Sequence, residues 1–244
     1  MSPSDPDAAP LGTVGVLIAG EERTPGDGYL TRSPYDGAPA AHAHLGGARE
    51  VADALDAVTR AFAVTKRLPS YRRSEILAEV SATLSRDRER FAEAIAREAG
   101  KPIGAALGEA DRAAFTFKVA SEEALRIGGE IVPLDWLPGM DGSRVEIRSV
   151  PLGPVSAITP FNYPLNLVAH KLAPALAAGD PIALRPDART PTAAVLLGRA
   201  ILDAGWPADG LAVVPTEVEH AAPFVEDDRL KLFSFTGSPL VGWM

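Results

Sequence analysis

Residues 151–191 read PLGPVSAITPFNYPLNLVAHKLAPALAAGDPIALRPDARTP. Two short apolar runs in this stretch, Val155 to Thr159 and Pro181 to Leu184, flank a longer apolar segment that ends at Ala178. Strands that alternate with helical segments of this length are typical of right-handed βαβ crossovers in a parallel sheet. The alternation continues through a helix from Thr190, its predicted N-cap, to Ala204, a strand from Leu211 to Val214, a short helix near Ala221 and a strand from Leu232 to Phe235. We therefore predict an α/β fold with a parallel sheet of about four strands.

The residues upstream of this stretch predict a helical segment. Apolar residues at intervals of three and four mark one face of a helix. Such a face is formed by Val51, Leu55, Val58 and Phe62. A second helix is predicted from about Ser70 to Ala99, and a third from near Pro102 to about Ile127. The pattern from Tyr29 to Leu45 predicts a strand, a turn and a strand.

Two further segments complete the expected organisation. Two β-rich runs, Glu130 to Trp136 and Arg144 to Val150, flank a turn signal and predict a long β-hairpin that projects as an arm. The many Pro, Gly and Asp residues near the N-terminus predict a mobile tail with at most a short strand near Val14 to Ile18. The expected division is a tail over 1–28, an N-terminal strand and helical part over 29–129, the hairpin over 130–150, and the βαβ part over 151–244.

The composition excludes several classes of protein. The chain has 244 residues, of which 46% are hydrophobic and 23% charged, and its net charge is -8. These values predict a folded globular protein, and the negative charge argues against nucleic acid or an anionic membrane as a partner. The apolar stretch from Leu165 to Ala178 is too short to cross a bilayer, and the acidic N-terminus does not resemble an export signal, so we expect a cytoplasmic protein. The absence of Cys excludes disulfides, thiolate metal sites and thiol nucleophiles within the chain.

Three strand-to-helix turns carry the candidate binding residues, because ligands of parallel sheets bind at the carboxyl ends of the strands. Asn162 follows the first strand and either offers an amide that stabilises an oxyanion or bonds its own backbone. Arg185 ends the second strand and either reaches a ribose or phosphate or is a surface arginine. The third turn joins Gly237 to Ser238 as an N-cap, and its free N–H groups favour a diphosphate. The chain has no Gly-x-Gly-x-x-Gly fingerprint of a standard phosphate-binding turn.

Several motifs in this order resemble the aldehyde dehydrogenase superfamily. They are GKP from residue 100, PLGPV from 151, PFNYP from 160, HKLAPALAAGD from 170, RPDARTP from 185, AGWP from 204 and FTGS from 235. The resemblance covers nearly everything after residue 28 and is nearest to the lactaldehyde-like and non-phosphorylating glyceraldehyde-phosphate-like branches. It implies the amino-terminal, cofactor-binding half of such an enzyme, with a partial Rossmann-like sheet and NAD or NADP as the cofactor.

The resemblance also implies a reaction and a set of site residues. Enzymes of this superfamily oxidise an aldehyde to an acid through a cysteine thiohemiacetal that gives up hydride to NAD(P). Asn162 corresponds to the oxyanion-hole amide. The superfamily's Cys nucleophile and base Glu correspond to positions beyond Met244, so we expect a truncated chain that is inactive alone. The implied cofactor-binding residues are Ile158, Thr159, Phe161, Asn162, Arg185, Gly237, Ser238 and Val241, and no metal ligand is implied.

Two departures from the superfamily pattern predict weak cofactor binding. Residues 185–188 read RPDA where Lys-Pro-Ser-Glu is usual, so a planar guanidinium replaces the ribose-binding Lys. Glu217 and Glu219 stand where Gly-x-Gly is common, and their charges repel a phosphate. The Arg185 side chain would suit the extra phosphate of NADP, and the choice between NAD and NADP stays open.

Two functional hypotheses stay open at this point. The chain is either the amino-terminal half of an aldehyde dehydrogenase, with the catalytic half supplied by a separate chain or by downstream sequence, or a non-catalytic homologue that acts by nucleotide binding or protein association. A decaying remnant without function is a third possibility. The expected partners are a nicotinamide dinucleotide and, through the hairpin over residues 130–150, another subunit. The aldehyde is not defined, because most of the substrate pocket belongs to the other half.

Overall fold

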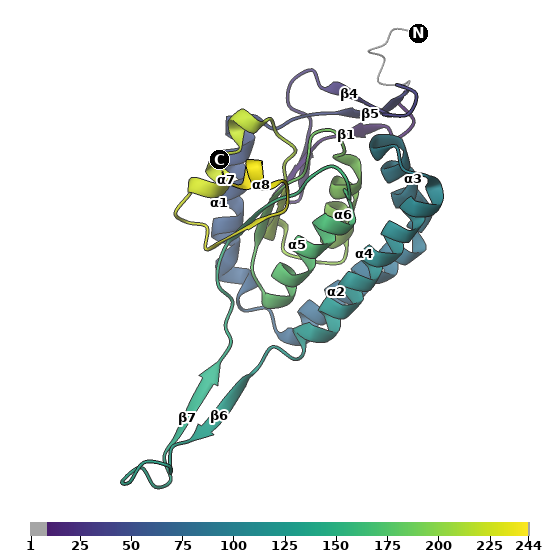
Figure 1. The fold of residues 1–244 in the computed structure, drawn as a ribbon. Coiled ribbons are helices and arrows are strands. Elements are labelled where there is room, and N and C mark those ends of the chain that lie inside the picture. The colour runs from purple at the N-terminus through teal and green to yellow at the C-terminus, as the bar shows by residue number, and fades with distance from the viewer. Residues whose placement is uncertain (1–8, 244) are drawn as a thin grey trace.

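A computed structural model of the chain describes residues 9–243 and contains one main sheet of six strands. The spatial order is β11-β8-β9-β10-β2-β3. Four of these strands are parallel neighbours, which confirms the predicted α/β fold and the four-stranded parallel part (Figure 1). They are β8 (Val155–Ile158), β9 (Ile182–Arg185), β10 (Leu211–Val213) and β11 (Leu232–Phe235).

Helices cover both faces of the sheet because side chains alternate between its two faces. The crossover helices α5 (Asn166–Ala178) and α6 (Thr192–Asp203) pack on one face, where Ile182, Leu184 and Val213 join their core. Helix α1 (Ala48–Thr65) packs on the other face against Ala183 and Ala212. Shorter helices complete the connections: residues 208–210, residues 218–220, α7 (Pro223–Glu226) and α8 (Pro239–Gly242).

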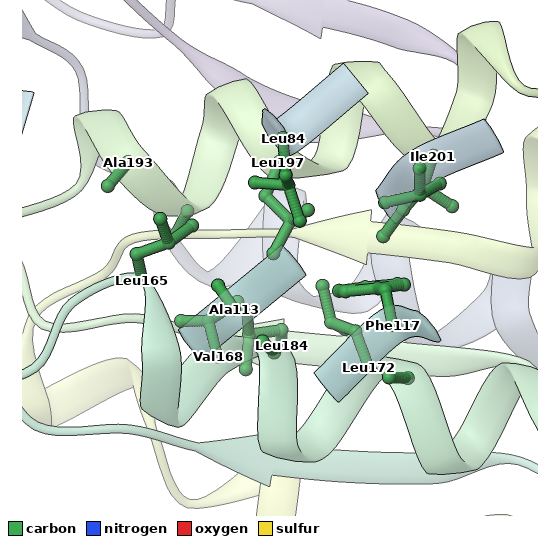
Figure 2. Packing of buried hydrophobic residues seen from close by; sticks show 14 of the residues in the cluster. Leu84, Ala113, Phe117, Leu165, Val168, Leu172, Leu184, Ala193, Leu197 and Ile201 are labelled. Carbon is green, nitrogen blue, oxygen red and sulfur yellow. The ribbon is translucent and has the colours of Figure 1, made fainter. Parts of the chain in front are cut away.

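A second layer of helices covers α5 and α6. It consists of α2 (Ser70–Arg86), α3 (Arg88–Ala99) and α4 (Ile103–Ala124). Figure 2 shows Ala113 and Phe117 of α4 next to Val168 and Leu172 of α5, all of them fully buried. No helix between residues 9 and 243 combines the length and the apolar character that crossing a membrane would require.

The expected single helix from Ser70 to Ala99 is wrong, because the structure breaks it into α2 and α3. Asp87 lies at the break with φ −97° and ψ 22°, outside the helical region. The apolar stripe alone did not reveal the break, since Leu84 and Phe91 are seven residues apart, which also fits one continuous helix. A short acidic side chain favours helix ends over helix interiors, which accounts for the position of the break.

Within the expected mobile tail over residues 1–28, the short strand allowed near Val14 to Ile18 is present, and a further strand at 21–23 was not expected, while residues 1–8 lie outside the described part. Strand β2 (Val16–Ile18) is buried and pairs antiparallel with β10, and β3 (Glu21–Arg23) pairs with β2 at the sheet edge. Burial of three consecutive apolar residues outweighs the local Pro and Gly signals. The remaining strands, β1 (Thr13–Val14), β4 (Tyr29–Arg32) and β5 (Pro39–Ala43), form a small separate sheet.

The predicted hairpin is present and projects from the body of the molecule (Figure 1). It consists of β6 (Gly129–Pro133) and β7 (Arg144–Arg148), which pair antiparallel and with no third strand among residues 9–243. Its role in joining subunits stays a prediction.

Charged side chains of the second layer cap both ends of helix α5. The Glu109 Oε1 atom accepts hydrogen bonds from the backbone N–H groups of Leu165 and Asn166, both at 3.0 Å. At the other end, Arg73 Nη1 donates to the Ala178 carbonyl at 2.7 Å. A negative charge at the helix N-terminus and a positive charge at its C-terminus both complement the helix dipole.

Glu98 of α3 caps helix α6 in the same way. Its carboxylate accepts hydrogen bonds from the Thr192 N–H at 3.0 Å, from the Thr192 hydroxyl at 2.7 Å and from the Thr31 hydroxyl at 3.0 Å. The predicted N-cap, Thr190, is therefore wrong: its hydroxyl is buried and has no partner among residues 9–243. Burial raises the pKa of Glu98 to about 7, although the three hydrogen bonds oppose this shift.

We expect this carboxyl group to make the free energy of unfolding depend on pH. The unfolded chain releases the Glu98 proton near pH 4.5 and the folded chain near pH 7, so stability falls across this interval and is constant above it. The loss should be about 3 kcal/mol. In Glu98→Gln the amide still accepts the Thr192 N–H and does not titrate. Urea unfolding of both proteins between pH 5 and 8 measures the effect, and a difference that stays constant with pH would contradict it.

Candidate functional site

The carboxyl ends of the parallel strands bring several predicted residues to one edge of the sheet. Ile158 of β8 is in register with Arg185 of β9 on one side and with Phe235 of β11 on the other. The Thr159 N–H donates to the Arg185 carbonyl at 3.1 Å, and the Thr236 N–H donates to the Ile158 carbonyl at 3.1 Å. Ile158, Thr159 and Arg185 are therefore neighbours, and Gly237 follows directly beside them.

Arg185 lies half-buried at this edge. Its Nη2 atom donates to the Thr216 carbonyl at 2.8 Å, which leaves only part of the guanidinium for a ligand. Burial lowers the pKa of Arg185, while the charges of Asp187 and Glu217 favour its charged form. The Nε atom of Arg185 and the hydroxyl of Thr159 are buried and have no hydrogen-bond partner among residues 9–243. Two unsatisfied polar atoms therefore lie on adjacent strand ends, both of them closed to solvent.

A cavity of about 660 Å³ lies beside Arg185. Strand β4 contributes Tyr29 to its lining, and the Tyr29 hydroxyl donates to the Ala188 carbonyl. Burial raises the pKa of Tyr29 well above its usual value, so the hydroxyl stays a donor. Glu98, Arg189 and Glu217 also line the cavity, so charged groups of both signs lie within a largely apolar lining.

Phe161 lies at the rim of this cavity under a charged side chain. The guanidinium carbon of Arg189 is 3.7 Å from the centroid of the Phe161 ring. Asp187 accepts hydrogen bonds from Arg189 Nε at 2.8 Å and from Nη2 at 2.7 Å, and these two bonds hold the guanidinium in place. The stack connects the turn after β8 to the turn after β9.

Asn162 lies in an exposed turn, and its side chain makes no hydrogen bond to the described residues. The backbone on its C-terminal side is fixed, because Glu109 caps Leu165 and Asn166. The neighbouring Tyr163 ring lies 3.5 Å from the Lys101 ammonium, measured to the ring centroid. The Asn162 amide is thus presented to solvent from an anchored turn.

Contacts within the protein explain the residues of the turn after β11 without a ligand. The Ser238 hydroxyl accepts from the Val241 N–H at 3.4 Å and caps α8, which has four residues. A Cβ atom at Gly237 would lie 2.3 Å from the tip of the Phe235 ring, so a larger residue there would have to displace that ring. Gly237, Ser238 and Val241 are exposed, and within residues 9–243 no hydrogen bond joins them to Asn162 or Arg185.

The main residues that sequence reasoning missed are the buried acids, Glu98 and Glu109. Glu109 shares a helix face with Ala106, Ala113 and Phe117, so a charge on an apolar stripe was the available signal. Asp187 and Tyr29 gave no comparable signal, because their partners become neighbours only in the fold. Within the described part of the chain, no group of three or more His, Cys, Asp or Glu side chains is placed to hold a metal ion.

Comparison with known proteins identifies relatives along almost the whole chain. The family model described as "Aldehyde dehydrogenase family" matches residues 22–243. A 3-sulfolactaldehyde dehydrogenase of Priestia aryabhattai is 38% identical over 233 residues, which cover 93% of this chain and 48% of that protein. The chain thus spans about half the length of the curated relatives it matches.

Solved structures agree with this match. Aldehyde dehydrogenase 21 from Physcomitrella patens, in complex with succinate, superposes with a TM-score of 0.90 at 37% identity, covering 95% of this chain and 48% of that one. The NADP-dependent glyceraldehyde-3-phosphate dehydrogenase of Bacillus halodurans C-125, complexed with NADP, superposes with a TM-score of 0.89 at 30% identity, covering 95% and 49%.

The contact between Gly237 and Phe235 gives a prediction about stability. Gly237→Ala should lower the free energy of unfolding by about 1–3 kcal/mol, because the added methyl group overlaps the Phe235 ring. The double variant Phe235→Leu/Gly237→Ala should recover part of this loss, measured as a coupling energy in urea unfolding. Gly104→Ala is the matched control, since its new Cβ meets nothing within 4 Å. If the double variant loses as much free energy of unfolding as the two single variants together, the Phe235 ring does not explain the need for glycine at position 237.

Proposed function

Because the chain belongs to the aldehyde dehydrogenase family, we propose that it forms the part of an aldehyde-oxidising enzyme that binds a nicotinamide dinucleotide. The observation that carries this proposal is the cavity of about 660 Å³ beside Arg185, at the carboxyl ends of the parallel strands. Ribose hydroxyls and phosphate oxygens are acceptors for the part of the Arg185 guanidinium that does not bond Thr216. The matched proteins named after aldehydes, and the relative complexed with NADP, support the same assignment.

The residues divide into two groups along the sheet edge. Ile158, Thr159, Phe161 and Asn162 would border the nicotinamide half of the cofactor, and Arg185 would meet the adenosine ribose. On the other side of β8, Gly237, Ser238 and Val241 would lie against the diphosphate. Since the Ser238 hydroxyl already caps α8, the backbone N–H groups of this turn are the donors that remain for it.

The proposed chemistry assigns one role to Asn162. When bound, the nicotinamide accepts the hydride that an aldehyde loses on oxidation. The Asn162 amide donates a hydrogen bond to the aldehyde oxygen and stabilises the negative charge that develops there. Glu109 and Lys101 hold the turn that carries this amide, so the donor keeps its position without being tied to a protein acceptor.

The nucleophile in this proposal comes from outside the 244 residues. The chain contains no Cys, whereas the family reaction proceeds through a Cys thiolate and a water-activating Glu. We propose that another polypeptide segment supplies both groups, and that the 244 residues alone bind cofactor without oxidising aldehydes. The alternative, a non-catalytic homologue that acts by nucleotide binding or protein association, predicts weak or no cofactor binding and no aldehyde oxidation.

Charges near Arg185 define the expected cofactor preference. A guanidinium at the end of the second strand suits the 2′-phosphate of NADP, so we expect NADP to bind more tightly than NAD. Glu217 lines the same cavity and opposes this preference through repulsion of phosphate.

We expect Glu217→Gln to tighten the binding of NADP about threefold, because one repelling charge is removed in a solvated cavity. Titration calorimetry of the 244-residue chain with NADP and with NAD measures both affinities. Glu226→Gln, an exposed carboxylate on α7, is the matched control and should leave both affinities unchanged. No heat with either cofactor, in the presence of an intact fold, would contradict the proposed function.

The hairpin is the proposed contact with another subunit. One of its faces carries Val132, Val145 and Ile147, of which Val145 and Ile147 are 41% and 48% exposed. Both hairpin edges lack a partner strand within residues 9–243, and such edges favour pairing with another copy.

We expect the chain to self-associate through this face. Light scattering after gel filtration should show a dimer or larger species, and the double variant Val145→Lys/Ile147→Lys should be a monomer. Val64→Lys changes an exposed apolar residue on α1 and should leave the oligomer intact. A monomeric wild-type chain at high concentration would refute the assignment.

A further inference from the structure

Two histidines lie next to each other in the small sheet, outside the candidate site. Strand β5 carries His42, and His44 follows its last residue (Figure 1). The His42 N–H donates to the Gly12 carbonyl and the His44 N–H to the Val14 carbonyl, both at 2.9 Å, so the extended backbone continues through His44. Residues two apart on such a backbone share a face. The two ring centroids are accordingly only 4.9 Å apart.

The face that carries the histidines borders solvent. Ala41 and Ala43 alternate with the histidines along the chain and are fully buried, so they occupy the face that packs on the helices. Thr13 of β1 is in register with His42 and is exposed. A small ligand can therefore reach the imidazoles without passing through the core.

A backbone carbonyl determines which nitrogen of His44 is free. The Nδ1 atom lies 3.1 Å from the Pro25 carbonyl oxygen. Because a carbonyl only accepts, Nδ1 carries the proton and Nε2 carries the lone pair of the neutral ring. Nε2 has no hydrogen-bond partner among residues 9–243 and is open to solvent, although the residue as a whole is buried. Histidines that bind metals commonly donate their other N–H to a backbone carbonyl, which fixes the ring in this way.

The loop over residues 24–28 also fixes the ring of His42. A Cβ atom at Gly28 would lie 2.8 Å from His42 Cε1 and 2.9 Å from His42 Nε2, so a larger residue would displace the ring. Gly28 also has a φ of +71°, which favours glycine. The His42 ring makes no hydrogen bond to residues 9–243, so its lone pair is not used by the protein.

The distance between the rings suits two ligands of one metal ion. A zinc–nitrogen bond of about 2.1 Å puts each ring centroid roughly 3.2 Å from the metal. Angles between a right angle and the tetrahedral angle at the metal then separate the centroids by about 4.5–5.2 Å. The observed 4.9 Å falls within this range. The rings are perpendicular to each other, which is compatible with coordination because each ring can turn about its own bond to the metal.

We propose that His42 and His44 bind a divalent transition-metal ion such as Zn²⁺ or Ni²⁺, with one nitrogen from each ring and water in the remaining positions. Imidazole is a preferred ligand of these ions, and the net charge of -8 favours a cation. No group of three His, Cys, Asp or Glu side chains exists within residues 9–243, so the protein supplies two ligands and the ion binds reversibly. A bound ion would tie β5 to the loop over residues 24–28 through the contacts of both rings.

The test is a calorimetric titration of the 244-residue chain with zinc chloride and with nickel chloride. One ion should bind per chain, and magnesium chloride should give no binding heat, because Mg²⁺ prefers oxygen ligands. Long-range proton–nitrogen NMR spectra of the zinc-loaded chain should show coordination at Nε2 of His44, with the proton retained on Nδ1, and a shift of one ring nitrogen of His42. Absence of heat with both transition metals, or coordination that leaves either ring unchanged, would refute the site.

Variants separate this site from other metal-binding groups on the surface. His42→Ala and His44→Gln should each weaken zinc binding at least about tenfold, since each removes one of two protein ligands. His42→Ala leaves the contact of His44 with Pro25 in place, and the amide of His44→Gln can still donate to that carbonyl, so both variants should fold. His220→Ala is the matched control, because His220 lies 3.4 Å from Glu219 and is the alternative pair for a metal. Binding that survives either of the first two substitutions, or is lost in His220→Ala, would overturn the assignment.

Discussion

Two buried carboxylates set the geometry on which the candidate site depends. Glu109 of α4 and Glu98 of α3 reach across the helical layer and cap the N-termini of α5 and α6. Those N-termini follow directly from the carboxyl ends of β8 and β9, so each cap fixes the turn that joins strand to helix. Arg73 holds the opposite end of α5. The positions of Asn162 and Arg185 are thus determined by residues more than fifty positions upstream.

The same arrangement explains why the site combines satisfied and unsatisfied polar groups. Two side chains that hold the backbone have several partners: Glu109 has three, and the Arg189 guanidinium has a two-point contact with Asp187. Arg185 Nε and the Thr159 hydroxyl have none within residues 9–243. Buried polar groups are rarely left unpaired without a functional reason. Arg73 Nε, the Thr190 hydroxyl and three further buried atoms also lack a partner there, so a missing hydrogen bond alone does not identify a ligand contact.

The sequence predicts the parts of this structure that depend on local pattern. The βαβ alternation after residue 151, the helix periodicity of α1 and the turn signal of the hairpin each lie within a short window. The helix break at Asp87 is missed because a one-residue break leaves the apolar periodicity unchanged. Thr190 is not the N-cap because Glu98, from another helix, accepts the hydrogen bond of the Thr192 N–H. Burial of residues 16–18 depends on β10, which no local window contains. The sequence predicts which residues lie at the strand ends. It does not predict the neighbours of Arg185, Phe161 and Asn162, because these depend on how the turns pack against one another.

The pairing of β2 with β10 has a consequence for how the chain folds during its synthesis. Leu17 and Val213 are paired, so β2 meets its neighbour only after roughly 200 more residues have been translated, which takes tens of seconds at ordinary ribosome rates. During that time the apolar segment 16–18 has only the short strand β3 to pair with, and it stays exposed to chaperones and to other nascent chains. The parallel strands must also form through non-local contacts, which slows folding. The N-terminal strand is therefore made early and docked late, and it closes the sheet as one of the final events of folding.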